Sequence, residues 1–425
     1  MVCRLIASFL LIIVFLLVSG CAGARESDDI AYVLATGIDK SATPGQLDVT
    51  YQVAVARALG GGEGGGGGEK QAVVNITITA ANLAEARNLL KSAISRIPNL
   101  SHNKMFIFGE ELAREGLGDI IAPFLRYREF RGSIFVMVVN GGTAKSYIEA
   151  NKPRLEALPS RYYESMLLTN DETSYYLRST IHEFYTRLKG GSASPFTVLG
   201  GINQGQETVK PDRRLLPGQK VNDFYAGHLP KSPGAQNPVE IMGTALFRED
   251  KMVGKLTGQE TRMLAILRNE YSKGFIIVAD PLVQNKQVNV AARLGESPKI
   301  KVRLADGRTY IDIKILLEGE VTSVSSGINY ESKEYRPLLE HAVSNLVKLQ
   351  MERMLTITQE LGSDVAGFGY YAKRNFSTFQ EWEQFEPRWM STYQHAEIAI
   401  DVETKLRRHG LLFRTSPIAR ENSDE

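Results

Sequence analysis

Cys21 is the residue whose surroundings point most clearly to a reaction in this 425-residue sequence. Its thiol can accept an acyl group, and the small residues Ser19 and Gly20 before it let a peptidase approach the backbone. An apolar run over 5–18 precedes them and is interrupted only by Ser8. That run has the length of a signal-peptide core and falls short of the roughly 20 residues that span a bilayer. The sequence therefore predicts a signal peptide over residues 1–20.

Lipidation of Cys21 is the second prediction from this region. The stretch Leu17-Val18-Ser19-Gly20-Cys21 resembles the lipobox of bacterial lipoproteins. A diacylglyceryl group brings two acyl chains, and two chains hold a protein durably at a membrane where one chain does not. An uncleaved anchor helix with an incidental cysteine is the alternative, against which the short helix and the small-small-Cys order argue. Cys3 would leave with the signal, so no disulfide could form within the mature chain.

The sequence shows no catalytic or metal-binding pattern. His182-Glu183 begins like a zinc-protease motif, but position 186 is Thr186, so the second ligand is missing. There is no G-x-S-x-G elbow and no Walker lysine. The sequence thus predicts no enzyme, no catalytic residue, no metal site and no cofactor, and it leaves any ligand-binding residues unknown. The histidines have no metal-ligand spacing and lie at positions 102, 182, 228, 341, 395 and 409.

The net charge argues against a nucleic-acid-binding protein, and the context of the glycines argues against a phosphate-binding loop. Losing residues 1–20 removes only Arg4 of the 50 basic residues, which leaves 49 against 48 acidic ones, so no nucleic-acid partner is expected. The glycine run over 60–68 matches a phosphate-loop pattern by chance and is interpreted as the tip of a hairpin. The basic cluster Arg126, Arg128 and Arg131 beside Glu129 could touch a partner or acidic lipids, but a solvated loop is favoured.

The hydrophobic periodicity predicts an N-terminal α/β domain over residues 21–205. Strand and helix patterns alternate as β-α-β-α-β, which is typical of helices packed on a sheet. The alternation begins after a strand pair that brackets the glycine run, and a further amphipathic helix follows it. The predicted strands are 30–34, 49–55, 74–78, 104–108 and 133–139, and the predicted helices are 83–97 (ended by Pro98), 117–125 and 174–188.

The rest of the chain is predicted to form a middle region, 206–285, and a C-terminal α+β domain, 286–425. The middle region opens with a polar stretch and continues with a hairpin over 242–256, a helix that Thr257 could cap and a strand at 274–278. A strand meander with a turn at Asp306-Gly307 follows, then a long helix over 332–361 and a last strand at 396–402. The predicted fold class is α+β and multi-domain, with mixed or antiparallel sheets, packed helices and a long helix in the C-terminal domain.

Several blocks together resemble the Ger(x)C lipoproteins, the C subunits of bacterial spore germinant receptors. The resemblance covers nearly the whole mature chain, with two departures: Ala22-Gly23 replaces the Trp-Asp common after the lipidated cysteine, and the glycine run is an insertion. The blocks are Asp28–Leu34 and Gly37–Lys40, Ser101–Lys104 leading to Phe108–Gly116, Arg126 and Arg131, Gly243–Phe247 with Lys251, Val253-Gly254 and Leu256, Glu260-Thr261-Arg262, and Lys273–Ile276.

The resemblance implies a non-catalytic subunit of a nutrient germinant receptor, on the outer face of the spore's inner membrane. It implies integral-membrane A and B subunits as partners in starting germination, and it carries over no ligand-binding residue. A solute-binding lipoprotein of a transport system is the alternative, against which the dissimilar halves argue. Calorimetry of the soluble body with amino acids and sugars separates these two functions. An envelope hydrolase would need a catalytic pair that the sequence does not show.

Overall fold

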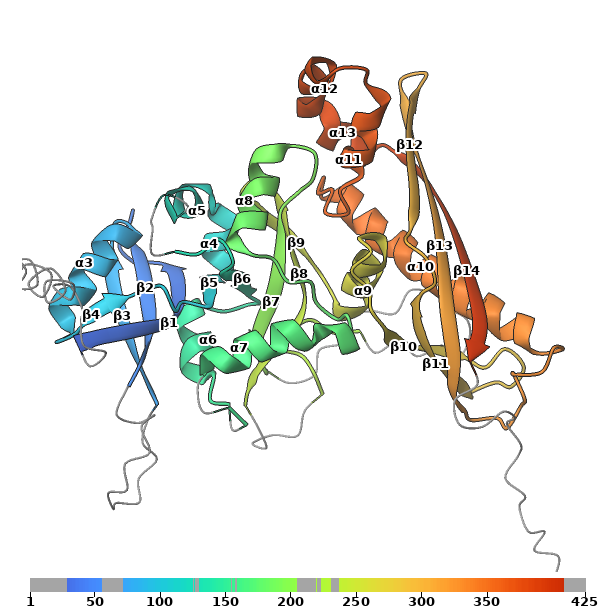
Figure 1. The fold of residues 1–425 in the computed structure, drawn as a ribbon, viewed down its shortest axis with the longest axis horizontal. Coiled ribbons are helices and arrows are strands. Elements are labelled where there is room, and N and C mark those ends of the chain that lie inside the picture. Colours follow the sequence, from blue (N-terminus) through green and yellow to red (C-terminus); the bar gives the residue numbers. More distant parts are fainter. Residues whose placement is uncertain are drawn as a thin grey trace, which may run out of the picture.

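The computed structural model describes residues 29–55, 72–124, 126, 130–153, 155, 156, 159–204, 219, 223–230 and 237–408. Over these residues the chain forms two β-sheets with helices packed against them (Figure 1). Parallel and antiparallel strands occur in both sheets, so the predicted α+β class with mixed sheets is confirmed. The predicted signal peptide, Cys21 and the glycine run lie outside the described residues.

The first sheet has nine strands, with the order β3-β2-β1-β5-β6-β7-β8-β9 and with β4 beside β1. Strands β1, β5, β6 and β7 run parallel in its middle, whereas β2 and β3 on one side and β8 and β9 on the other pair antiparallel. The strands are β1 (Ile30–Lys40), β2 (Leu47–Ala54), β3 (Val73–Ala80), β4 (Ile97–Asn99), β5 (Met105–Gly109), β6 (Phe135–Val139), β7 (Phe196–Ile202), β8 (Val239–Arg248) and β9 (Lys251–Leu256).

Both faces of this sheet are covered by helices. Phe106 and Phe108 of β5 point into a core with α4, α5 and α8, and Met105 and Ile107 point into a core with α6 and α7 on the other face. Helix α3 covers β2 and β3 on the α5 side. The helices are α3 (Leu83–Ala93), α4 (Glu110–Glu115), α5 (Gly118–Phe124), α6 (Ala144–Ala150), α7 (Pro159–Leu168) and α8 (Ile181–Gly190).

Two predicted helix boundaries are wrong. The helix predicted over 83–97 ends at Ala93, because Ile94 already has extended backbone, and Pro98 lies in β4. The helix predicted over 174–188 begins only at Ile181, where the preceding residue forms a capping box. Ser174 has a φ of 54°, which no residue inside a right-handed helix adopts. Local backbone geometry overrides the apolar periodicity at both places.

In the second sheet, β10 pairs with β11, and β11 and β12 pair with successive parts of one edge of β13. β14 pairs with the opposite edge of β13. β14 runs parallel to β13, whereas the other pairs are antiparallel. Alternate residues of β13 are buried, so one face of this sheet packs on α9 and α10 and the other faces solvent. The strands are β10 (Gly274–Ala279), β11 (Gln287–Leu294), β12 (Lys299–Ala305), β13 (Arg308–Val324) and β14 (Glu397–Arg408).

Local signals explain most of the elements of the second half. Asp306 and Gly307 have φ values of 52° and 72°, as a two-residue hairpin loop between β12 and β13 requires. Thr257 caps α9 in a capping box with Glu260, which confirms the predicted cap. The long helix is α10, which extends from Arg336 to Glu360. The helices are α9 (Gly258–Leu267), α10 (Arg336–Glu360), α11 (Phe368–Ala372), α12 (Phe379–Phe385) and α13 (Trp389–Gln394), with 3₁₀ turns η3 (Thr169–Glu172), η4 (Lys373–Asn375) and η5 (Glu386–Arg388).

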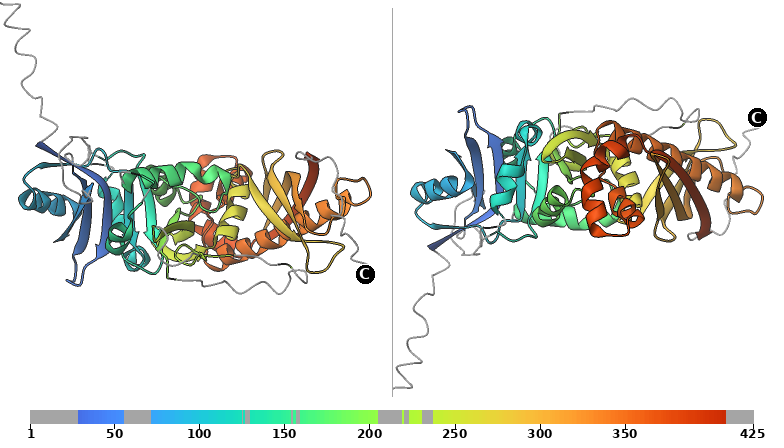
Figure 2. Two further views of the ribbon diagram at one scale, coloured as in Figure 1. Left: turned by 90° about the horizontal axis from the view of Figure 1, so that it is seen from below. Right: turned by 90° about the horizontal axis from the view of Figure 1, so that it is seen from above.

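The two sheets lie at opposite ends of an elongated molecule (Figure 2). They divide the predicted middle region between them, because β8 and β9 extend the first sheet and β10 begins the second. Hydrogen bonds join the segment after α10 to β8 and to the end of α9. The Ser363 hydroxyl donates to the carbonyl of Phe247 at 2.7 Å, and the Arg268 guanidinium donates to the carbonyl of Val365 at 3.0 Å. The domain limits at 205 and 285 stay predictions.

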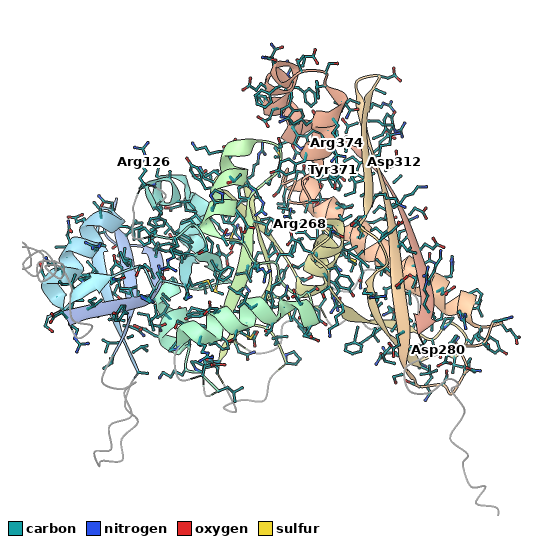
Figure 3. All side chains as sticks on the ribbon, in the orientation of Figure 1. Arg126, Arg268, Asp280, Asp312, Tyr371 and Arg374 are labelled. Atoms are coloured by element: carbon teal, nitrogen blue, oxygen red, sulfur yellow. The ribbon has the colours of Figure 1, made fainter. Side chains whose placement is uncertain are left out.

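The solvent-facing side of the second sheet carries charged side chains (Figure 3). Arg303 of β12 pairs with Asp312 of β13 at 3.0 Å, and Arg293 of β11 pairs with Glu318 of β13 at 2.8 Å. The Arg303–Asp312 pair adds little stability, since both of its side chains stay hydrated. Among the described residues, no helix has both the length and the apolarity needed to cross a membrane.

Candidate functional site

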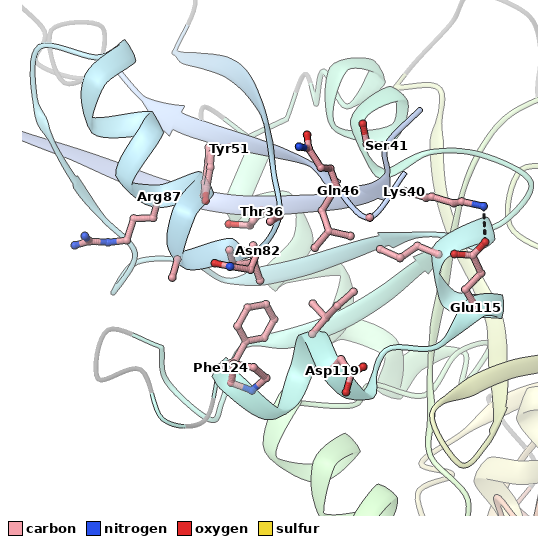
Figure 4. Close-up of a pocket in the computed structure, with 18 of the residues that line it drawn as sticks. Thr36, Lys40, Ser41, Gln46, Tyr51, Asn82, Arg87, Glu115, Asp119 and Phe124 are labelled. Atoms are coloured by element: carbon pink, nitrogen blue, oxygen red, sulfur yellow. Dashed lines mark hydrogen bonds and ion pairs between the residues drawn. The ribbon is translucent and has the colours of Figure 1, made fainter. Parts of the chain in front are cut away.

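A cavity of about 570 Å³ lies on one face of the first sheet, between α3 and α5 (Figure 4). Its volume falls within the usual range for ligand sites, about 300–1,000 Å³. Its floor comes from β1 and β2, and the turn between these strands closes one end. The lining is mainly apolar and consists of Thr36, Lys40, Ser41, Pro44, Gly45, Gln46, Leu47, Tyr51, Ala81, Asn82, Leu83, Ala84, Arg87, Leu100, Leu112, Glu115, Asp119, Ile120, Pro123, Phe124 and Phe130.

Strand register places the floor residues. Thr36 of β1 lies directly opposite Tyr51 of β2, after a register shift between Val33 and Ala35. Both side chains are 1% exposed although they line the hollow. The amide of Asn103 donates to the Thr36 hydroxyl at 3.1 Å, which fixes that side chain. The floor is therefore preformed.

Reciprocal caps and ring stacking hold the two walls. At the start of α3, Asn82 Oδ1 accepts from the backbone amide of Glu85 at 3.0 Å, and the Glu85 carboxylate accepts from the backbone amide of Ala81 at 2.8 Å. In the opposite wall, Phe124 of α5 stacks on Phe106 with ring centres 4.4 Å apart, and Phe130 packs edge-on against Phe106. The cap thus fixes the backbone at the start of α3, and the ring contacts fix the aromatic side chains of the opposite wall.

Ion pairs close the mouth beside β1. Lys40 pairs with Glu115 and, at 2.9 Å, with Glu111, both on α4. The hydrogen bonds to Glu115 and Glu111 raise the pKa of the Lys40 ammonium above its usual value. All three side chains remain solvated, so the pairs position the Lys40 side chain at the mouth and add little to the stability of the fold.

A second polar group lies at the carboxyl ends of the parallel strands, where α/β sheets often bind ligands. Glu110, directly after β5, accepts from the amide of Gly141 at 2.7 Å and contacts Arg114 and Lys255. Burial alone would raise the pKa of Glu110, but these donors and cations outweigh it and lower the pKa. Lys255 also donates to Asn140 Oδ1 at 2.7 Å. These contacts tie β9 to β5 and β6, which is a structural role.

Asp39 at the end of β1 also has a structural role. Its two carboxylate oxygens accept from the amides of Ala144 and Lys145, at 2.7 and 2.9 Å, at the start of α6. Burial raises the pKa of Asp39, although these two amides oppose the shift. A Cβ at Gly109 would come within 2.3 Å of the Asp39 carboxylate, so glycine is needed at that position.

Two buried carboxylates lie where α9 meets α10. Glu260 pairs with Arg353 of α10 at 3.1 Å, and Asp223 accepts from the amide of Gln259 at 3.2 Å. Burial raises the pKa of both carboxyls, and the Asp223 charge raises that of Glu260 further. Both are engaged in helix caps and an ion pair, so they join elements rather than face a cavity.

The structure does not assemble the residues that the sequence singled out into one site. His182 lies on α8, and its carbonyl accepts from the Thr186 hydroxyl at 2.8 Å, as in an ordinary helix turn. Among the described residues, no three His, Cys, Asp or Glu side chains lie close enough to hold a metal ion. Arg126 and Arg131 are exposed, whereas Arg128 and Cys21 lie outside the described part of the chain.

Sequence reasoning missed the cavity and one buried anchor. The cavity has no local signal, because its lining comes from segments between Thr36 and Phe130 that only the fold brings together. The anchor is Asp364, which accepts from the amides of Gly367 and Gly369 and from the indole of Trp389, each at 2.8–2.9 Å. The positive φ of Gly367, 79°, marks the turn that makes this possible.

Two family models match the sequence. "Spore germination protein N-terminal domain" covers residues 23–199, and "Spore germination B3/GerAC like, C-terminal" covers residues 242–410. The chain belongs to the Ger(x)C family of spore germination proteins. This confirms the resemblance found in the sequence, and it covers both halves of the Ger(x)C chain.

Individual relatives agree with this assignment. Spore germination protein KC of Bacillus subtilis (strain 168) is 23% identical over 434 residues, which cover 100% of both chains. Spore germination protein GerQC of Bacillus cereus is 20% identical over 409 residues, 95% of this Ger(x)C chain and 98% of GerQC. The crystal structure of the GerBC protein matches with a TM-score of 0.52 and 16% identity, covering 88% of this chain and 98% of that one. At that identity the likeness to GerBC shows a shared fold alone.

Proposed function

We propose that this Ger(x)C protein is a non-catalytic, lipid-anchored subunit of a nutrient germinant receptor. It acts with the integral-membrane A and B subunits on the outer face of the spore's inner membrane. The observation that carries the proposal is the match of both halves, 23–199 and 242–410, to spore germination families. The lipobox that ends at Cys21 supports the anchor.

The chemistry of the described residues supports a non-catalytic role. The buried carboxylates Asp39, Glu260 and Asp364 accept bonds from helix-start amides, a cap and an indole. A general acid or base has to reach a substrate, and each of these groups is already occupied by the fold. The protein then contributes by assembling with its partners through its folded body.

Deletion of the gene tests the receptor role. In a strain with no paralogue, spores should form normally but lose nutrient-triggered germination, because the A and B subunits lack their third partner. Optical density after nutrient addition reports germination, and heat-resistant spore counts report sporulation. Normal germination of the deletion strain contradicts the proposal.

Replacement of Cys21 tests the anchor. Cys21→Ala should abolish incorporation of labelled palmitate and release the protein from the membrane fraction, because no other cysteine of the mature chain can be acylated. Cys3→Ala is the matched control, since Cys3 lies within the predicted signal peptide and should leave both properties unchanged. Membrane retention of an unlabelled Cys21→Ala protein would show that something other than the lipid holds it.

A further inference from the structure

The cavity of the first sheet exists because two helical layers do not meet. Helix α3 packs on the core of β2 and β3, and α5 packs on the core of β5 and β6. Leu47 and Leu83 lie between these two cores and contact both, and both line the hollow. A stretch of the sheet face over β1 and β2 is therefore left without a covering helix.

We propose that this cavity binds a small, uncharged and largely apolar molecule. A volume of about 570 Å³ accommodates a ligand of one or two rings. Rings stand on both sides of the space, with Tyr51 on the sheet side and Phe124 on the α5 side (Figure 4). This binding site goes beyond the receptor role and does not depend on it.

The charges around the cavity argue against a charged ligand. The Lys40 ammonium at the mouth is already paired with Glu111 and Glu115. The guanidinium of Arg87 extends away from the other lining side chains (Figure 4). The remaining charged residue of the lining, Asp119, is exposed to solvent. An ionised group buried among the apolar walls would thus lose its water without gaining a buried counter-charge, which is costly. Free amino acids and sugars, being charged or densely polar, fit such walls poorly.

One polar group can orient a ligand. The Thr36 hydroxyl accepts from Asn103, and a hydroxyl that accepts one bond still has a proton to donate. It lies in the floor with 1% exposure. A ligand with one acceptor oxygen or nitrogen would satisfy it.

Burial of the lining favours a small molecule over the side chain of a protein partner. Thr36, Tyr51 and Phe124 line the hollow, yet each is only 1–2% exposed. A helix or strand of a partner has to reach a surface that already faces solvent, whereas a free small molecule can enter a recess. The sheet, both helices and the turn after Ser41 border the cavity, which is partly open to solvent.

A pair of fluorescent probes tests the chemistry. N-phenyl-1-naphthylamine is uncharged, and 1-anilinonaphthalene-8-sulfonate has the same rings with an added sulfonate. The full-length protein, purified in detergent, should bind the uncharged probe at one saturable site. It should bind the sulfonate at least about tenfold weaker, which corresponds to the cost of an uncompensated charge.

Two tryptophan substitutions on α3 locate the probe. Ala84→Trp puts an indole into the cavity from the exposed first turn of the helix, and should weaken binding of the uncharged probe at least tenfold. Ala93→Trp is the matched control, because it lies nine residues, or two and a half turns, further along and so on the opposite side of the helix. It should leave binding unchanged. If Ala84→Trp does not fold, Gln46→Trp fills the cavity from the turn instead.

Three results would overturn the proposal. The first is equal binding of the uncharged probe by the Ala84 and Ala93 variants, and the second is equal affinity for the two probes. The third is no binding by the wild type together with loss of germination in the Ala84→Trp strain, which would assign the cavity to a partner's side chain. None of these results bears on the receptor role, which gene deletion tests separately.

Discussion

Several buried carboxylates in this protein accept hydrogen bonds from backbone amides, and Asp280 combines two such amides with two side-chain hydroxyls. It follows β10 and accepts from Ser326 and Tyr330, both at 2.5 Å, and from the amides of Leu282 and Val283, at 2.9 and 3.0 Å. Burial alone would raise the pKa of Asp280, but these four donors outweigh it and lower the pKa. One side chain therefore joins the turn after β10 to the segment after β13.

Asp280→Asn should destabilise the protein in a pH-dependent way. The folded-state pKa of Asp280 lies below the unfolded value of about 3.9. The stabilisation is therefore complete above the unfolded pKa and is lost as the pH falls through the folded pKa. At pH 7 the variant should lose about 1–3 kcal/mol in free energy of unfolding, measured by urea denaturation. Near pH 2 the difference from the wild type should shrink.

Asp312→Asn is the control for this prediction. It makes the same carboxylate-to-amide change at an exposed position, where the partner is Arg303 on the solvated face of the sheet (Figure 3). Its cost should stay below about 1 kcal/mol. A larger loss at Asp312 than at Asp280, or a loss at Asp280 that grows toward acid pH, would contradict the assigned role of Asp280.

Among the elements, the β12–β13 hairpin is set by its turn. Gly307→Ala should cost about 1 kcal/mol, because an alanine at a φ of 72° brings its Cβ against its own backbone. No other atom lies within 4 Å of the added Cβ, so the cost is conformational. Gly190→Ala at the end of α8 also meets open space, but at an ordinary φ, and should be neutral or stabilising. Thermal midpoints of both variants measure the contrast, and equal midpoints would refute the explanation.

Elements with strong local signals could be predicted from the sequence. The Asp306-Gly307 turn, the Thr257 cap and the strand meander around that turn each depend on neighbouring residues, and each is confirmed. The sequence predicts the existence of α10 but does not fix the rotation of the helix: Leu338 is exposed, whereas Val343 and Val347 are buried, because packing against β14 and α9 sets that rotation. The cavity and the bonds to Asp364 need long-range contacts, which periodicity does not contain.

At the scale of the whole molecule, α9 makes the two halves share one core. Phe196, Leu246 and Leu256 belong to strands of the first sheet, yet they lie in the same buried cluster as the second sheet and α10. Nine of the ten residues of α9 are buried, with its side chains packed toward both halves. The family's two matched regions, 23–199 and 242–410, are therefore joined by a continuous core.

Unfolding should accordingly be cooperative across both halves. The two tryptophans, Trp382 and Trp389, report only on the second half, whereas far-ultraviolet circular dichroism reports on both. In urea the two signals should give one coincident midpoint. Leu264→Ala in α9 should lower both midpoints together, by about 2–5 kcal/mol of stability. Leu89→Ala, at a 43% exposed leucine of α3, should change neither by much. Two separate transitions in the wild type would show independent halves.

The parallel pairing of β14 with β13 also has a consequence for synthesis. β13 is complete at residue 324, but the strand that closes its far edge begins only at residue 397. A chain that stops between these points, through a premature stop codon or a stalled ribosome, exposes the unpaired edge of a 17-residue strand with one apolar face. Such an edge recruits strands from other chains, so truncated products should accumulate as aggregates rather than as smaller folded proteins.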